Sequence, residues 1–231
     1  MCEDISVALH GIEAVTEARV LVVRGEGPAF CAGADLAAVS GRGGLEFLPA
    51  FERMLEALAQ CRLPTVASIH GAALGGGLQL ATVCDFRIAT DTAKLGIPSS
   101  KLGIVVNFEN VQRLVLLAGI AVAKEVLMTG RTYSGADAVA AGLVNRSVPE
   151  SELDVATSDL AIDLAERSPL SVQGAKRSIQ LIVDHLASAR GASPNLVAEI
   201  DRLVEEAYGS EDLQEGVKAM AEKRAPNFRG H

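Results

Sequence analysis

Through the first two thirds of the chain, short β-branched apolar runs alternate with longer stretches in which apolar residues recur at helical spacing. The short runs predict strands at residues 20–24, 65–69, 86–89, near Leu95, and 143–148. The helical spacing predicts helices at 2–17, 45–60, 78–84, 107–118, 121–128 and 135–141. Ser134 precedes the last of these as its N-cap. This alternation of the two periods predicts an α/β core.

From residue 151 onward the pattern is helical only, with predicted helices at 153–167, 169–189, 194–208 and 211–224. Pro169 and Pro194 begin two of them, because proline at the first helical position loses no hydrogen bond. No repeat of fixed period is visible. We therefore divide the chain into a core, residues 1–167, and a C-terminal helical region, residues 168–231.

Two turns in the core carry small residues after a strand. Gly75, Gly76 and Gly77 follow the strand at 65–69, and the segment Phe30-Cys-Ala-Gly-Ala-Asp-Leu36 follows the strand at 19–24. Glycines let a backbone turn sharply and approach a ligand, and N–H groups at a helix start lack intrahelical partners. Two such turns predict two donors to one oxyanion. The alternative is that the glycines only permit tight packing of helix on strand.

Charge and aromatic content argue against nucleic-acid binding. The net charge is −8 with no basic stripe, and the aromatic residues are two Tyr and six Phe, without Trp. The longest apolar run, 114–123, lies between Arg113 and Lys124 and is too short to span a bilayer. We predict no membrane span.

The cysteines and the N-terminus favour a reduced, cytoplasmic setting. Cys2, Cys31, Cys61 and Cys84 are scattered, with no partner at zinc-binding spacing, so each is expected to act as a small apolar residue and no metal is predicted. The first residues lack the basic and apolar regions of a signal peptide.

Taken together, the motifs resemble the enoyl-CoA hydratase/isomerase (crotonase) superfamily, from about Ala18 to the C-terminus. The matching segments are Ala32-Gly-Ala-Asp-Leu36, His70-Gly-Ala-Ala-Leu-Gly-Gly-Gly77, Cys84-Asp85, Gly96-Ile-Pro98, Leu102-Gly103, Gln112-Arg-Leu114 and Glu222-Lys-Arg-Ala-Pro-Asn-Phe228. Order and approximate spacing follow the family, and the set is specific where a single glycine cluster is not.

The resemblance implies a crotonase-like spiral of β-β-α units, with C-terminal helices that form a trimerisation region. A homotrimer, or a hexamer of two stacked trimers, is therefore expected. Members usually begin with two antiparallel strands that contribute to the wall facing CoA. This sequence begins within the first helix and lacks those strands.

The resemblance also implies a ligand, the thioester of an acyl-CoA in fatty acid metabolism. The backbone N–H groups of Ala34 and Gly76 would donate to its carbonyl oxygen and stabilise an enolate-like intermediate. Ala32, Asp35 and Leu36 would contact the substrate, and Lys223 would approach the CoA nucleotide. The alternative for Lys223 is a cation favoured by a helix C-terminus. No separate cofactor is implied, since CoA is part of the ligand.

The acid/base positions depart from the hydratase pattern. The glutamates of the familiar hydratases are replaced by Gln79 and Ser99. Glutamine neither takes nor gives a proton near neutral pH, and a lone serine is a poor base. Ordinary hydration is therefore not expected, since it needs both a base on water and an acid at the α-carbon.

Other polar residues have simpler interpretations. Glu109 would lie in the first turn of a helix capped by Asn107, where the dipole stabilises a carboxylate, and this is favoured over a catalytic base. Asp35 is expected to cap a helix, Asp85 to make structural hydrogen bonds, and His70 to be packed and satisfied.

Two functions remain open from the sequence. The first is a lyase or isomerase of the crotonase type, acting on acyl-CoA with a substituted acid and base. The second is a non-catalytic protein that binds acyl-CoA and presents it to a partner. Gln79 and Ser99 count against the first and in favour of the second.

Overall fold

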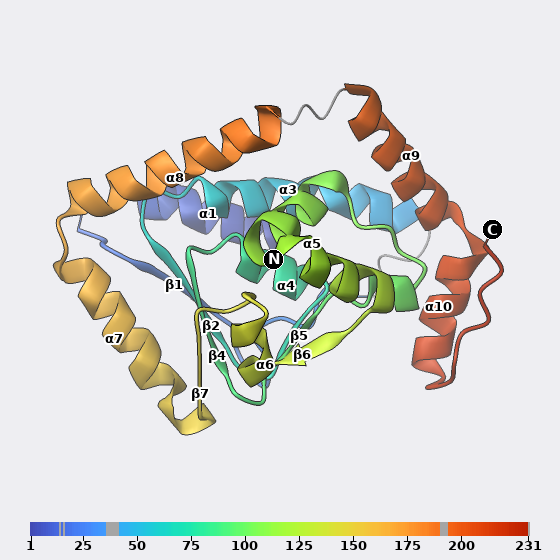
Figure 1. The fold of residues 1–231 in the computed structure, drawn as a ribbon, viewed down its shortest axis with the longest axis horizontal. Coiled ribbons are helices and arrows are strands. Elements are labelled where there is room, and N and C mark those ends of the chain that lie inside the picture. Colours follow the sequence, from blue (N-terminus) through green and yellow to red (C-terminus); the bar gives the residue numbers. More distant parts are fainter. Residues whose placement is uncertain (14, 16, 36–41, 190–193, 231) are drawn as a thin grey trace.

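The computed structural model describes residues 1–13, 15, 17–35, 42–189 and 194–230 (Figure 1). Its helices are α1 (Cys2–Glu13), α3 (Arg42–Ala59), α4 (Gly76–Thr82), α5 (Phe108–Thr129), α6 (Gly135–Ala140), α7 (Leu153–Glu166), α8 (Pro169–Ala189), α9 (Pro194–Gly209) and α10 (Glu211–Ala221). Its strands are β1 (Leu21–Arg24), β2 (Thr65–Ile69), β3 (Ala72–Leu74), β4 (Phe86–Thr90), β5 (Lys94–Gly96), β6 (Thr132–Ser134) and β7 (Arg146–Val148).

The strands form two sheets that the chain visits in turn. The larger sheet is parallel throughout, in the order β1-β2-β4-β7. The smaller sheet has the order β3-β5-β6, in which β3 and β5 are parallel and β6 is antiparallel. From β2 the chain passes to β3 and then to α4; from β4 it passes to β5 and then to α5. This repetition is the spiral of β-β-α units that the family resemblance implied.

Most predicted elements are confirmed, with shifted ends. β2 has the predicted bounds, and the predicted helices at 107–118 and 121–128 are one element, α5, broken at Gly119 (φ 80°). Ser134 caps α6 as expected, accepting from the Asp137 N–H. The helix predicted at 45–60 begins earlier, at Arg42, and α4 begins at Gly76 rather than at residue 78.

Two strands were missed and one was predicted too long. β3 lies within the segment interpreted as a glycine turn, and β6 directly precedes the α6 cap. Both have three residues, too few to show alternation, and they form only because a neighbouring strand supplies their hydrogen bonds. The strand predicted at 143–148 is short because Leu143 turns back, its N–H donating to the Ala138 carbonyl, so β7 begins at Arg146.

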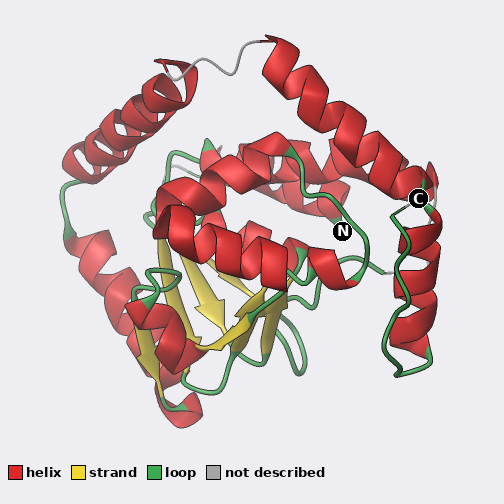
Figure 2. Cartoon of the chain, turned by 45° about the vertical axis from the view of Figure 1, so that its right-hand side comes forward, coloured by secondary structure: helices red, strands yellow, loops and turns green. Residues whose placement is uncertain are grey.

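The core lies between the sheets and the helices that cover them (Figure 2). All five residues of β2 are buried, as expected of a parallel strand covered on both faces. On one face α3 and α4 contribute buried side chains, among them Met54, Leu55 and Leu78. On the other, α7 packs Leu153 and Ala156 against Val66 and Ile88.

Asp85, at the entry to β4, makes the structural contacts expected of it. Its Oδ2 atom accepts from the Thr65 N–H at 2.7 Å, from the Thr65 hydroxyl at 3.0 Å and from the Lys176 ammonium at 2.7 Å. Lys176 belongs to α8 and also donates to the Leu63 carbonyl. These contacts join the start of two adjacent strands to the C-terminal helical region.

Gly77, at the start of α4, has no room for a side chain. A Cβ there would lie 2.0 Å from the Cys31 carbonyl oxygen, a backbone atom that cannot turn aside. We expect Gly77→Ala to destabilise the protein by about 3 kcal/mol, measured by denaturant unfolding. The control is Gly174→Ala in α8, where a Cβ meets nothing within 4 Å and alanine should stabilise the helix by up to ~1 kcal/mol. Equal stability of the two variants would contradict the close contact.

Candidate active site

The two predicted turns lie against each other. A Cβ at Gly33 would stand 2.9 Å from the Leu74 carbonyl oxygen and 3.6 Å from the Gly76 nitrogen. Gly33 has φ +101° and Gly75 has φ +55°, conformations that side chains rarely adopt. Cys31 and Ala73 also form a parallel bridge across the junction. The backbones therefore touch where side chains would have kept them apart.

Several backbone N–H groups around this junction are already paired. Those of Leu74 and Gly75 donate to the carbonyls of Cys31 and Gly96, and those of Leu78 and Gln79 donate to the Gly75 carbonyl. Within the described part of the chain, the N–H groups of Ala34 and Gly76 have no such acceptor. Other amides of the two bends, those of Gly33 and Gly77 among them, likewise have no backbone acceptor among the described residues. Ala34 and Gly76 are the two that the family resemblance singles out.

Both bends line one cavity of about 220 Å³. Its other walls come from α3, from the segment before α5 and from the C-terminal helices. Apolar side chains dominate, including Phe47 and Phe51, whose rings stack with centroids 5.3 Å apart. The polar side chains that line it are Gln79, Ser99, Asn107, Asn110 and Tyr208.

Arg87 fixes the far end of α4. Its guanidinium is buried and donates to the carbonyls of Ala81 and Cys84, which close that helix, and its Nε donates to the Leu143 carbonyl. Burial lowers the pKa of Arg87. Burial also raises the pKa of the Cys84 thiol to about 12, so this cysteine is a neutral apolar residue, as the sequence indicated.

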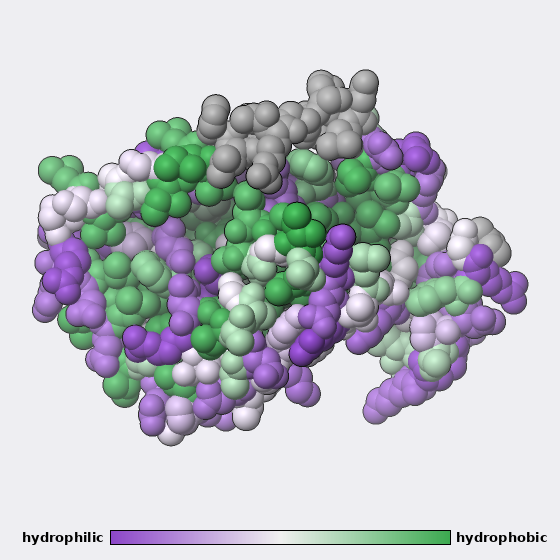
Figure 3. Space-filling model, viewed as in Figure 1, coloured by the Kyte–Doolittle hydropathy of each residue, from purple (hydrophilic) through white to green (hydrophobic). Residues whose placement is uncertain are grey.

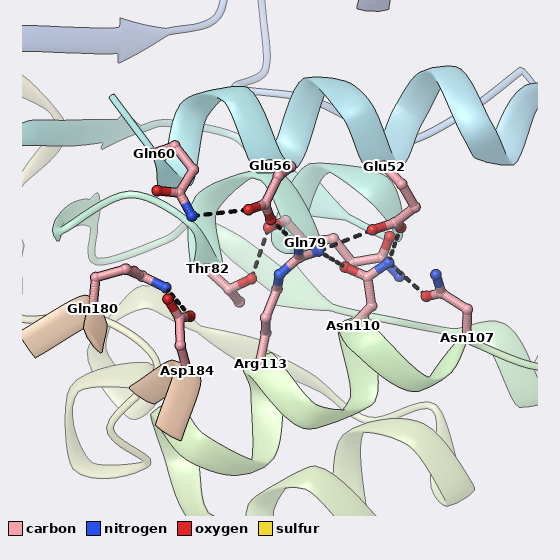
Figure 4. A network of polar contacts seen from close by, with 10 residues as sticks. All are labelled: Glu52, Glu56, Gln60, Gln79, Thr82, Asn107, Asn110, Arg113, Gln180 and Asp184. Atoms are coloured by element: carbon pink, nitrogen blue, oxygen red, sulfur yellow. Dashed lines mark hydrogen bonds and ion pairs between the residues drawn. The ribbon is translucent and has the colours of Figure 1, made fainter. Parts of the chain in front are cut away.

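A network of polar contacts joins α3 to the start of α5 behind the cavity (Figure 4). Glu52 on α3 accepts from the Asn110 amide and from Arg113 at 3.0 Å. The Asn110 Nδ2 atom also donates to Asn107 Oδ1 at 2.6 Å, and Arg113 donates to Asn110 Oδ1 at 3.1 Å. Arg113 further contacts Glu56 at 3.3 Å. The carboxylates of Glu52 and Glu56 are thus engaged with a cation.

Comparisons with known proteins identify the family of this chain. A sequence model described as enoyl-CoA hydratase/isomerase matches residues 1–231. The chain belongs to the enoyl-CoA hydratase/isomerase family. It is 36% identical over 233 residues to a Bacillus subtilis protein named "Probable enoyl-CoA hydratase", covering 99% of this chain and 88% of that protein.

Solved structures of the family have the same fold. An enoyl-CoA hydratase/carnithine racemase from Magnetospirillum magneticum superposes with a TM-score of 0.76 at 28% identity, over 100% of this chain and 86% of that one. A methylmalonyl-CoA decarboxylase in complex with 2-nitronate-propionyl-CoA superposes with a TM-score of 0.88 at 26% identity, over 100% and 88%. Of these two, the decarboxylase is the closer in backbone.

Gln79 and Ser99, which the sequence resemblance assigns to the positions of the family's acid and base, both line the cavity. Gln79 comes from α4 and is half-buried. Its backbone carbonyl accepts a hydrogen bond from the Thr82 hydroxyl. Ser99 is buried, at the start of the short 3₁₀ helix Ser99–Lys101. The structure therefore brings both positions to the cavity, without a carboxylate at either.

The remaining candidates lie at its edge or away from it. Ala32 lines the cavity; Asp35 is exposed beside it, and Leu36 lies outside the described residues. Glu109 is exposed in the first turn of α5 and is not part of the lining, which favours its interpretation as a dipole-stabilised carboxylate. His70 is satisfied, as expected, by the Gly27 carbonyl at 2.8 Å.

Lys223 follows α10 in a left-handed conformation (φ 54°) and is exposed. Its neighbour Arg224 pairs with Glu215 at 2.6 Å, and Glu215 also accepts from the Asn227 N–H. Arg224 and then Asn227 lower the pKa of Glu215 to about 2. Because the pKa of Glu215 is depressed, its contact with Arg224 contributes fully to the stability of the fold above the ordinary carboxyl pKa. This contribution is lost as the pH falls toward 2. The tail that carries Lys223 is thus tied to α10.

Sequence reasoning missed Glu52, Asn110 and Tyr208. Tyr208 reaches the cavity from α9, and burial raises its pKa, so its hydroxyl stays protonated. With Met220 of α10 it brings the C-terminal helical region into the cavity wall. The spacing of Asn107, Asn110 and Arg113 does indicate one helix face, but only tertiary packing shows that Glu52 meets it. Among the described residues, no cluster of three metal-ligating side chains occurs.

No helix in the described part of the chain has the length and apolar character needed to cross a bilayer.

Removing Glu52 should destabilise the protein, because Arg113 and Asn110 would lose their shared acceptor. The side chains of Glu52 and Arg113 are only 24% and 21% exposed. We expect Glu52→Ala to cost about 1–3 kcal/mol in urea unfolding. Glu109→Ala, at an exposed glutamate, is the matched control and should stay within about 0.5 kcal/mol. The reverse order would show that the network is not structural.

Proposed function

We propose that this family member binds an acyl-CoA thioester, with the thioester oxygen between the N–H groups of Ala34 and Gly76. The observation that carries the proposal is that both N–H groups lack an acceptor among the described residues and both residues line the same cavity. Fixed dipoles in an apolar cavity stabilise developing charge better than water does. One such donor typically contributes about 3–4 kcal/mol to the transition state.

Ordinary hydratase activity is not expected of this site. Gln79 and Ser99 stand where the family's glutamates act, and the carboxylates of Glu52 and Glu56 are held by Arg113. General acid and base groups are each worth roughly 10²–10⁴ in rate, so a site without them binds far better than it hydrates. The alternative function is accordingly a non-catalytic protein that presents fatty acyl-CoA to a partner.

A second candidate is decarboxylation of a carboxyacyl thioester, favoured by the backbone likeness to methylmalonyl-CoA decarboxylase. In this reaction the bond between the α-carbon and the carboxylate breaks, its electron pair forms the enolate, and CO₂ leaves. Water then protonates the α-carbon. The step needs an electron sink for the thioester oxygen but no base, which suits a site with Ala34, Gly76 and Gln79.

We also propose that the protein is a homotrimer or hexamer held by its C-terminal helical region, residues 168–231. α8 runs along the margin of the molecule and exposes the large apolar residues Leu170, Ile179, Leu181 and Ile182. Figure 3 shows apolar atoms gathered over this helix. Lys223 follows Met220, which lines the cavity, by three residues. It would contact the CoA nucleotide in the same or a neighbouring subunit.

The protein should bind a short trans-2-enoyl-CoA without hydrating it. Calorimetry is expected to show saturable binding, while loss of the conjugated thioester absorbance should stay near the uncatalysed rate. Absence of binding would contradict the proposed function. Rapid hydration, abolished by Glu109→Gln, would show instead that an unrecognised acid/base operates.

Restoring carboxylates should restore hydration if the two positions are placed correctly. We expect Gln79→Glu with Ser99→Glu to raise hydration by at least about tenfold, given what one general acid or base contributes. The control is Gln79→Glu alone, which supplies only one of the two groups. Unchanged hydration in the double variant, with intact binding, would contradict the placement of these residues.

A further inference from the structure

A second cavity, of about 340 Å³, lies where α8 passes the end of α3 (Figure 1). Its lining includes residues 59–62, which precede β2, whereas the candidate active site is lined by residues 74–76, which follow β2 and β3. The two cavities share no lining residue among those described. The second cavity is therefore separate from the candidate active site, at the opposite end of β2.

The polar side chains that line the second cavity are cations and amides. No carboxylate is among the described lining residues, and the polar ones are Gln60, Arg62, Gln173, Lys176, Arg177 and Gln180. The chain as a whole has a net charge of −8, so a cavity lined in this way departs from the overall charge. Guanidinium, ammonium and amide N–H groups donate hydrogen bonds to anions. The composition of the lining therefore favours an anionic ligand.

Lys176 is the cation whose charge is already compensated. Its Nζ atom donates to the Leu63 carbonyl at 2.8 Å and to Asp85 Oδ2 at 2.7 Å. Its side chain is only 13% exposed. Lys176 thus fixes α8 against the entry to β2 and leaves the net charge of the cavity to the two arginines.

Arg62 and Arg177 keep uncompensated charges. Arg62 Nη2 donates to the Val15 carbonyl at 3.0 Å, and Arg177 Nη1 donates to Gln60 Oε1 at 3.3 Å. Both acceptors are neutral, and neither arginine forms an ion pair with a carboxylate in the described part of the chain. A guanidinium carries five N–H donors, so most of the donors of each arginine remain available to a ligand.

The three cations do not cap α3. That helix ends at Ala59 beside the cavity, and a helix C-terminus attracts positive charge. The hydrogen bonds of Arg62, Lys176 and Arg177 nevertheless go to groups outside α3. Capping of the helix therefore does not account for the two uncompensated guanidinium groups.

We propose that the second cavity binds a small molecule that carries a phosphate group, with Arg62 and Arg177 as the residues that hold the phosphate. The planar fork of a guanidinium matches two phosphate oxygens, and two such groups together neutralise a phosphate dianion. The volume leaves room for more than a phosphate, so the remainder of a phosphate ester would lie beside Ala59 and Cys61. Binding of a thioester at the candidate active site is not required.

The test is calorimetric titration of the full chain with inorganic phosphate and with glycerol 3-phosphate, at constant ionic strength in chloride. We expect saturable binding at one site per chain. Arg62→Gln and Arg177→Gln should each weaken binding about five- to tenfold, because each removes charged hydrogen bonds. Arg146→Gln is the matched control, because it removes the same charge from an exposed arginine of β7 outside the cavity, and it should change binding less than twofold.

The two ligands separate the sources of the phosphate group. Tighter binding of glycerol 3-phosphate would identify a phosphate ester as the ligand, and equal binding would identify free phosphate. Arg177 is exposed, so its variant should stay folded even where Arg62→Gln does not.

Three results would overturn the proposed phosphate site. The first is the absence of saturable binding of either ligand to the wild type. The second is equal weakening in all three variants, which would reflect only the overall charge of the protein. The third is displacement of phosphate by saturating acyl-CoA, which would place the phosphate in the candidate active site. Failure of acyl-CoA to bind at all would count against the proposed function and leave the phosphate titrations unaffected.

Discussion

The close contact between two backbone bends is the constraint on which the rest of the structure depends. Gly33 and Gly77 face the carbonyls of Leu74 and Cys31 at distances that exclude a side chain. Because the bends touch, Ala34 and Gly76 line one cavity. Helix α4 is held at both ends. Before its start, the Gly75 N–H donates to the Gly96 carbonyl, and at its end the buried Arg87 donates to the carbonyls of Ala81 and Cys84.

In the proposed function this arrangement supplies fixed dipoles, and no carboxylate side chain lines the cavity among the described residues. Partial charges on the two amides face a largely apolar cavity, where they act strongly on a developing oxyanion. Formal charges are kept behind the wall, where Arg113 pairs with Glu52 and Glu56. A site of this kind polarises a thioester well and transfers protons poorly. Binding, or chemistry that needs only an electron sink, follows more readily from it than hydration.

The fold was predictable where a pattern is local. β2 has its predicted bounds because a short run rich in β-branched residues, followed by a glycine turn, favours a buried strand. The Ser134 cap is also readable from the sequence alone. β3 was not predictable, because three residues show no period and depend on β5 for partners. The same holds at the site. The glycine bends were visible, whereas Glu52 and Tyr208 reach the cavity region from helices far along the chain and leave no local signal.

The central claim, that the amides of Ala34 and Gly76 converge on a thioester oxygen, is tested most directly by vibrational spectroscopy of a bound acyl-CoA labelled with ¹³C at the thioester carbonyl. Two hydrogen bonds from fixed donors weaken the carbonyl double bond. We therefore expect the carbonyl stretch of the bound ligand to lie well below its frequency in water. An unchanged or raised frequency, with the ligand fully bound, would contradict it.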